Sequence, residues 1–76
     1  MSFNQRLKSI RQKNHKTQKE VAEILGMTTN AYQKYELGKL EPNLTKLVIL
    51  ADLFNVSTDY LLCRDDFIKS HVTSAD

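Results

Sequence analysis

Residues 17–36 read TQKEVAEILGMTTNAYQKYE, and this stretch predicts two short helices that flank a single glycine, Gly26. Ala22 lies four residues before that glycine, and a side chain this small lets two crossing helices approach each other closely. Gly26 can adopt the positive φ that a tight turn directly after a helix requires, at no steric cost. The layout is that of a helix-turn-helix, in which the turn holds the second helix out.

The apolar residues of this stretch divide both helices into a buried side and a polar side. Val21 and Leu25 are four residues apart and share one face of the first helix. Tyr32 and Tyr35 are three apart on the second helix, and we expect them to pack against that face rather than serve as stacking platforms. The other side of the second helix carries residues that can bond to DNA bases or phosphates: Thr29, Asn30, Gln33 and Lys34.

Start and stop signals predict five short helices along the chain. They cover about residues 3–13, 18–25, 29–37, 44–54 and 58–62. The expected N-caps are Thr17, Thr28, Asn43 and Ser57. Glu20 completes a capping box with Thr17, and Gly38 and Asn55 are expected left-handed stops. Short helices joined by short loops predict an all-α domain.

The fourth of these helices has a wide apolar face, so we expect it to be the most buried of the five. That face would consist of Leu44, Leu47, Val48, Leu50, Ala51 and Phe54.

The composition is that of a small globular protein. The chain has 76 residues, 41% of them hydrophobic and 26% charged, which suits one domain with a modest core. Its longest apolar run is far short of the ~18 residues that a membrane span needs. The N-terminus does not resemble a signal peptide, so we expect a cytoplasmic protein. The lone Cys63 excludes an internal disulfide and a cysteine zinc site.

Charge is distributed unevenly along the chain. Residues 1–39 hold eight Lys or Arg and three Asp or Glu, a balance of +5. Residues 40–76 hold three and six, a balance of −3. Such a polarised chain has one half fit for a polyanion, although a solvated basic helix surface would give the same asymmetry.

The sequence TQKEVAEILGMTTNAYQKYELGKLEPN, followed by LVILADLFNVSTDYLL from Leu47, resembles the Cro and phage-repressor type of helix-turn-helix, the XRE family. The resemblance covers about residues 3–62. It implies a five-helix lambda-repressor-like DNA-binding domain over residues 1–63, with the helix-turn-helix at the second and third helices. Residues 64–76 would then form a weakly structured or dimer-associated tail. The implied function is a sequence-specific transcriptional regulator, a repressor that binds an operator in double-stranded DNA as a homodimer.

The resemblance also assigns roles to individual residues. Those expected to face bases are Thr28, Thr29, Asn30, Gln33 and Lys34. Those expected to contact phosphates are Gln18, Lys39 and Asn43. Arg11 and Glu36 match an ion pair that ties the first helix to the end of the third. Asn30 and Gln33 are the strongest candidates for base contact, because an amide can bond to adenine N6 and N7 together; without the motif, both would be ordinary exposed residues.

The dimer surface is expected at the fifth helix and the tail, with Tyr60, Leu61, Phe67 and Ile68 as candidates. The alternative function is a protein-interaction module, an antitoxin or an adaptor, that uses the same fold.

Neither catalysis nor a cofactor is expected. The sequence has no glycine-rich phosphate loop, no HExxH motif and no nucleophile elbow, and a domain this small leaves little room for a substrate cleft. His15 and His71 lie far apart in the sequence and lack the spacing of metal ligands. We therefore expect no metal site and no small-molecule substrate.

Overall fold

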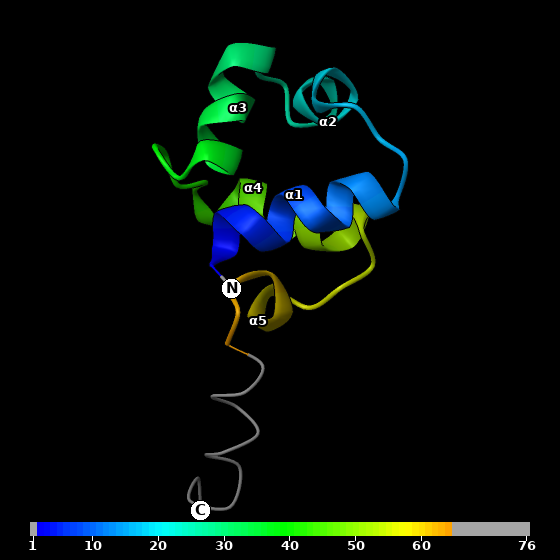
Figure 1. Ribbon diagram of the computed structural model, residues 1–76, viewed down its shortest axis with the longest axis vertical. Coiled ribbons are helices and arrows are strands. Elements are labelled where there is room, and N and C mark those ends of the chain that lie inside the picture. The colour runs from blue at the N-terminus through cyan, green and yellow to red at the C-terminus, as the bar shows by residue number, and fades with distance from the viewer. Residues whose placement is uncertain (1, 65–76) are drawn as a thin grey trace, which may run out of the picture.

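The computed structural model describes residues 2–64, and this part of the chain folds into five helices without a strand (Figure 1). The helices are α1 (Phe3–Lys13), α2 (Gln18–Ile24), α3 (Thr29–Leu37), α4 (Leu44–Leu53) and α5 (Thr58–Leu61). The all-α prediction is confirmed, and the predicted ranges differ from these by one residue at most. Apart from Arg64, the expected tail lies outside the described residues, and Phe67 and Ile68 lie there with it.

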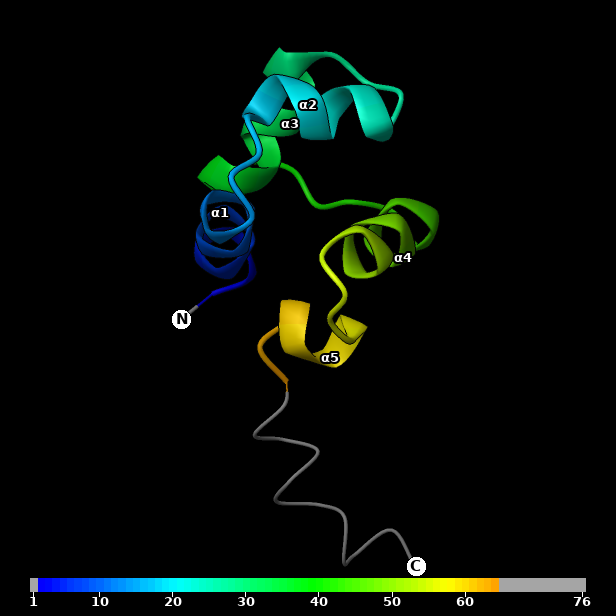
Figure 2. The same ribbon diagram turned by 90° about the vertical axis from the view of Figure 1, so that its right-hand side faces the viewer.

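The helices form two groups that α1 joins. α2 and α3 pack against each other at one end of the domain, and α1 packs against α3 (Figure 1). α4 and α5 pack together on the other side, and α5 also contacts α1 (Figure 2). The helix-turn-helix pair α2 and α3 therefore projects from a base made by the remaining helices.

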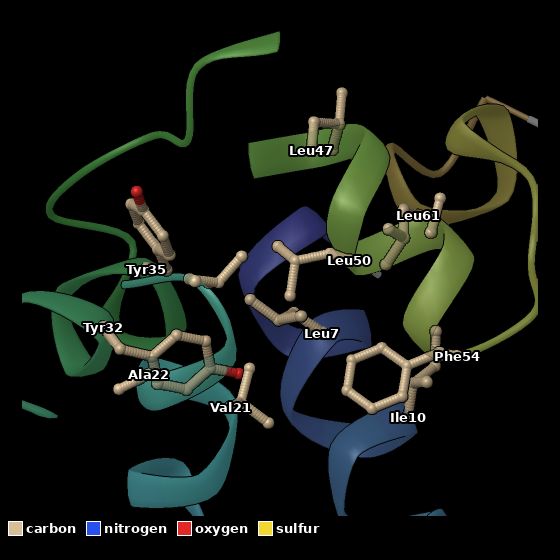
Figure 3. Packing of buried hydrophobic residues seen from close by; sticks show 12 residues of the cluster. Leu7, Ile10, Val21, Ala22, Tyr32, Tyr35, Leu47, Leu50, Phe54 and Leu61 are labelled. Atoms are coloured by element: carbon tan, nitrogen blue, oxygen red, sulfur yellow. The ribbon is translucent and has the colours of Figure 1, made fainter. Parts of the chain in front are cut away.

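One hydrophobic core holds these helices together. Among residues 2–64 the buried apolar side chains are Leu7, Ile10, Val21, Ala22, Leu25, Tyr32, Tyr35, Leu47, Leu50, Ala51, Phe54 and Leu61. Figure 3 shows Leu7 and Ile10 of α1 beside Leu50 of α4 and Phe54, which directly follows α4. Ala22 is 1% exposed, as the close approach of α2 and α3 predicts.

Tyr32 and Tyr35 lie in this core and not on the surface. Both rings are buried, with their centroids 5.9 Å apart and their planes at 78°. This edge-to-face arrangement is a favourable geometry for packed aromatic rings. The prediction that the two tyrosines pack inside rather than offer stacking platforms is confirmed.

The predicted helix ends are confirmed in detail. Thr17 accepts a hydrogen bond from the Glu20 amide at 3.0 Å, and Glu20 Oε1 accepts one from the Thr17 amide at 2.8 Å, which completes the capping box. The side chains of the other three expected caps also accept from backbone amides. Gly26 has φ 69°, Gly38 has φ 76° and Asn55 has φ 54°, all left-handed.

The prediction that the fourth helix is the most buried is met only in part. Leu47, Leu50 and Ala51 of α4 and Phe54 directly after it are buried, whereas α1 and α3 bury three residues each. Leu44 is 81% exposed and Val48 is 49% exposed, although both belong to the predicted apolar face. The core reaches only the side of α4 that faces α1 and α5, so the other flank of a broad apolar surface stays in solvent.

The expected dimer surface also needs a correction. Leu61 is fully buried inside its own domain, so it is not available to a partner. Tyr60 is half-buried and lies under the Arg6 guanidinium, whose carbon is 4.2 Å from the ring centroid. Arg6 also donates to the Tyr60 carbonyl at 2.8 Å. Through these contacts α5 packs against α1 within the same domain.

Candidate nucleic-acid interface

The polar face of α3 is accessible. Thr28, Asn30 and Lys34 are exposed, and Thr29 and Gln33 are half-buried. The hydroxyl oxygen of Thr28 accepts from the Ala31 amide at 3.1 Å, which caps the helix and leaves the hydroxyl proton to donate elsewhere. None of the five residues predicted to face bases is therefore enclosed by the described part of the chain.

Gln18, at the first position of α2, lies against α3. Its Nε2 donates to Glu36 Oε1 at 3.0 Å, and its Oε1 accepts from Gln33 Nε2 at 3.0 Å. A hydrogen bond therefore joins Gln18, which was predicted to contact phosphate, to Gln33, which was predicted to contact a base. The sequence gives no sign of this link, because it depends on how α2 crosses α3.

The predicted ion pair between Arg11 and Glu36 is confirmed and is buried. Arg11 Nε donates to Glu36 Oε2 at 2.6 Å, and Arg11 Nη2 donates to Glu36 Oε1 at 3.0 Å. A third nitrogen of the same guanidinium, Nη1, donates to the Lys16 carbonyl at 2.9 Å. Arg11 thereby fixes α1, the corner before α2 and the end of α3 in one arrangement.

Two further groups complete the surroundings of Glu36, and the sequence reasoning missed both. The Tyr32 hydroxyl donates to Glu36 Oε2 at 2.5 Å, and Asn4 Nδ2 donates to the Glu36 carbonyl at 3.4 Å. The spacing of four residues from Tyr32 to Glu36 places both on one face of α3 and is the signal that could have indicated the first contact.

These contacts determine the charge state of the cluster. Burial on its own raises the pKa of Glu36, but hydrogen bonds from Arg11, Tyr32 and Gln18 outweigh burial and hold that pKa below its usual value. The hydrogen bond to Glu36 raises the pKa of Arg11. At neutral pH the Glu36 carboxyl group is therefore ionised and acts only as a hydrogen-bond acceptor.

The residues predicted to contact phosphates lie on either side of α3. Lys39 and Asn43 are exposed in the segment between α3 and α4. Asn43 Oδ1 accepts from the Lys46 amide at 2.9 Å, so its amino group remains free to donate to an anion. On the other side, a depression of about 290 Å³ is lined by Lys8, Gln18, Gln33, Glu36 and Leu37.

Lys8 was not among the predicted site residues, although it lines this depression beside Gln18 and Gln33. It lies three residues before Arg11 on α1, so the two share a helix side. That spacing is the signal that could have placed Lys8 near α3. An exposed lysine here adds positive charge next to the start of α2.

A short α2, a left-handed glycine turn and an accessible polar α3 together define a helix-turn-helix domain. Residues 7–61 match the family model described as helix-turn-helix, and the chain belongs to this family. The fold and the resemblance expected from the sequence are thus confirmed.

Several relatives are named as transcriptional regulators. The HTH-type transcriptional regulator ImmR of Bacillus subtilis is 45% identical over 73 residues, which cover 96% of this chain and 58% of that protein. The cryptic phage CTXphi transcriptional repressor RstR of Vibrio cholerae is 36% identical over 64 residues, 84% of this chain and 57% of that protein. The chain thus spans little more than half the length of these relatives. Their names describe regulators rather than enzymes, in agreement with the expectation of no catalysis.

A solved structure shares this fold. It is the P22 c2 repressor protein in complex with a synthetic operator, with a TM-score of 0.76 and 27% sequence identity. The match covers 82% of this chain and 94% of that one. Within residues 2–64, no helix has the length and apolar content to cross a bilayer.

Proposed function

We propose that this protein is a sequence-specific DNA-binding transcriptional repressor that binds its operator as a homodimer in the cytoplasm. The observation that carries the proposal is the accessible polar face of α3, held out from the domain by the glycine turn. The solved P22 c2 structure contains an operator, and the relative RstR is named a repressor, which supports the same function here.

In this proposal α3 enters the major groove of the DNA and α2 lies across the sugar–phosphate backbone. Thr28, Thr29, Asn30, Gln33 and Lys34 face base edges. The backbone contacts come from Gln18, Lys39 and Asn43. Lys39 and the free amino group of Asn43 are donors that suit a phosphate, and they lie in one segment after α3.

Selection of bound duplexes from a random pool tests both parts of the function. We expect enrichment of one sequence in two symmetric copies, with centres about 34–36 Å apart, because a two-fold dimer presents its two α3 helices one duplex turn apart. Enrichment of a single asymmetric site, together with a monomer in sedimentation on that site, would contradict the dimer. A pool that stays random would contradict sequence-specific binding.

The salt dependence of duplex binding distinguishes this function from the rival one, a protein-interaction module. Each phosphate contact releases counterions, so DNA affinity should fall steeply as the salt concentration rises. On the polar face of α3, Thr29, Asn30 and Gln33 are polar and uncharged, whereas the centres of protein interfaces favour aromatic residues and arginine. A chain that retains no duplex even at low salt would favour the rival.

Substitutions at Gln33 and Lys39 should weaken binding in different ways. Gln33→Ala should cost about 1–3 kcal/mol on the selected duplex and relax the preference at one base pair, because it removes a base contact. Lys39→Ala should weaken all duplexes by a similar factor and reduce the salt slope by about one, because it removes a phosphate contact. Titrations on the selected and a scrambled duplex at several salt concentrations measure both effects. Lys13→Ala, at an exposed position near the end of α1, is the control.

A further inference from the structure

We propose that Glu36, acting through Gln18, fixes the direction in which Gln33 presents its amide, and so makes Gln33 prefer adenine over guanine. The inference rests on the proposed DNA-binding function. It assigns Gln18 and Glu36 as positioning residues for base recognition, in addition to any phosphate contact that Gln18 makes.

The first step is the orientation of the Gln18 amide. Glu36 Oε1 accepts from Gln18 Nε2 at 3.0 Å, and the ionised carboxylate has no proton to donate. A reversed Gln18 amide would set its oxygen against Glu36 Oε1 and lose the hydrogen bond. Arg11 and Tyr32 hold the carboxylate in place from its other sides, so Gln18 must turn its amino group toward Glu36.

The second step is the orientation of the Gln33 amide. With its amino group on Glu36, Gln18 turns its Oε1 toward α3, where the oxygen accepts from Gln33 Nε2 at 3.0 Å. A reversed Gln33 amide would bring two carbonyl oxygens together, so Gln33 too has one favoured orientation. Within residues 2–64 no donor occupies Gln33 Oε1, and one Nε2 hydrogen also remains for a ligand.

The third step is the match to a base. In the major groove adenine offers the N6 amino group as donor and N7 as acceptor, whereas guanine offers two acceptors, O6 and N7. The free oxygen and the remaining hydrogen of Gln33 are complementary to adenine. Guanine would place its O6 against Gln33 Oε1, and the amide could turn over only by breaking its bond to Gln18.

The substitution Gln18→Lys tests this chain of contacts. A lysine can still pair with Glu36, but it offers only donors to α3, so the Gln33 amide should reverse and present its amino group to the groove. At the base pair that Gln33 reads, we expect the preference to move from adenine toward guanine by about tenfold or more. Gln18→Ala should remove the preference without reversing it. Affinities of the 76-residue chain for duplexes with each base at that position provide the measurement.

The same measurements in a Gln33→Ala background separate positioning from phosphate binding. If Gln18 acts through Gln33, Gln18→Lys should change all duplexes equally once Gln33 is absent. The proposal is overturned if Gln18→Lys changes all duplexes equally in the presence of Gln33, or if the base-specific change persists without it. It is also overturned if Gln33→Ala changes no base preference. A wild-type chain that discriminates no duplex contradicts the proposed function instead, which keeps the two failures distinct.

Discussion

Replacing Glu36 by alanine is expected to lower the free energy of unfolding by about 3–5 kcal/mol. The substitution leaves the buried Arg11 guanidinium without its counter-charge, and it removes the acceptor of the Tyr32 hydroxyl and of Gln18. Small domains have a total stability of only about 5–15 kcal/mol, so this loss is a large part of the whole. Urea denaturation at pH 7, followed by circular dichroism, gives the change.

Two comparison variants show whether the buried pair causes the loss. Glu23→Ala removes an exposed carboxylate from α2 and should change the stability by no more than about 0.5 kcal/mol. The double variant Arg11→Met with Glu36→Met should recover part of the loss, because much of the penalty comes from the unpaired charge. A Glu36→Ala variant as stable as Glu23→Ala would mean that the pair contributes little.

The elements predicted well from the sequence are those with local signals. Thr17 and Glu20 form a capping box because both lie in one helical turn, and a positive φ at Gly26 follows from the turn alone. The hydrogen bond between Gln18 and Gln33 was missed because it depends on how α2 crosses α3. It also depends on the Glu36 carboxylate, which Arg11 of α1 holds in place. Hydrogen-bond direction in the site is therefore a tertiary property, although every participating residue type is visible in the sequence.

The α4 helix shows the limit of periodicity. Its apolar residues cover so much of the helix surface that the pattern alone does not define a single buried side. The positions of α1 and α5 decide which side is covered, and they bury Leu50 but leave Leu44 and Val48 in solvent. The same cause explains Leu61, which was expected on a dimer surface and is covered by its own domain.

The difference between two leucines of α4 provides the second large effect. Leu50→Ala should lower the free energy of unfolding by about 2–5 kcal/mol, because Leu50 is fully buried between α1 and α4 and its removal leaves a cavity (Figure 3). Leu44→Ala is the matched control, with the same chemical change in the same helix. Leu44 is 81% exposed, so its substitution should change the stability by no more than about 0.5 kcal/mol.

Thermal and urea unfolding of both variants at equal concentration measure this difference. Equal losses of stability at the two positions would contradict the packing of α4 described above. If the core covered both leucines, each substitution would leave a cavity and lower the free energy of unfolding. A large loss at Leu50 alone would mean that α4 is held by one narrow side. The exposed apolar flank that carries Leu44 and Val48 would then be left without a role in the stability of the single domain.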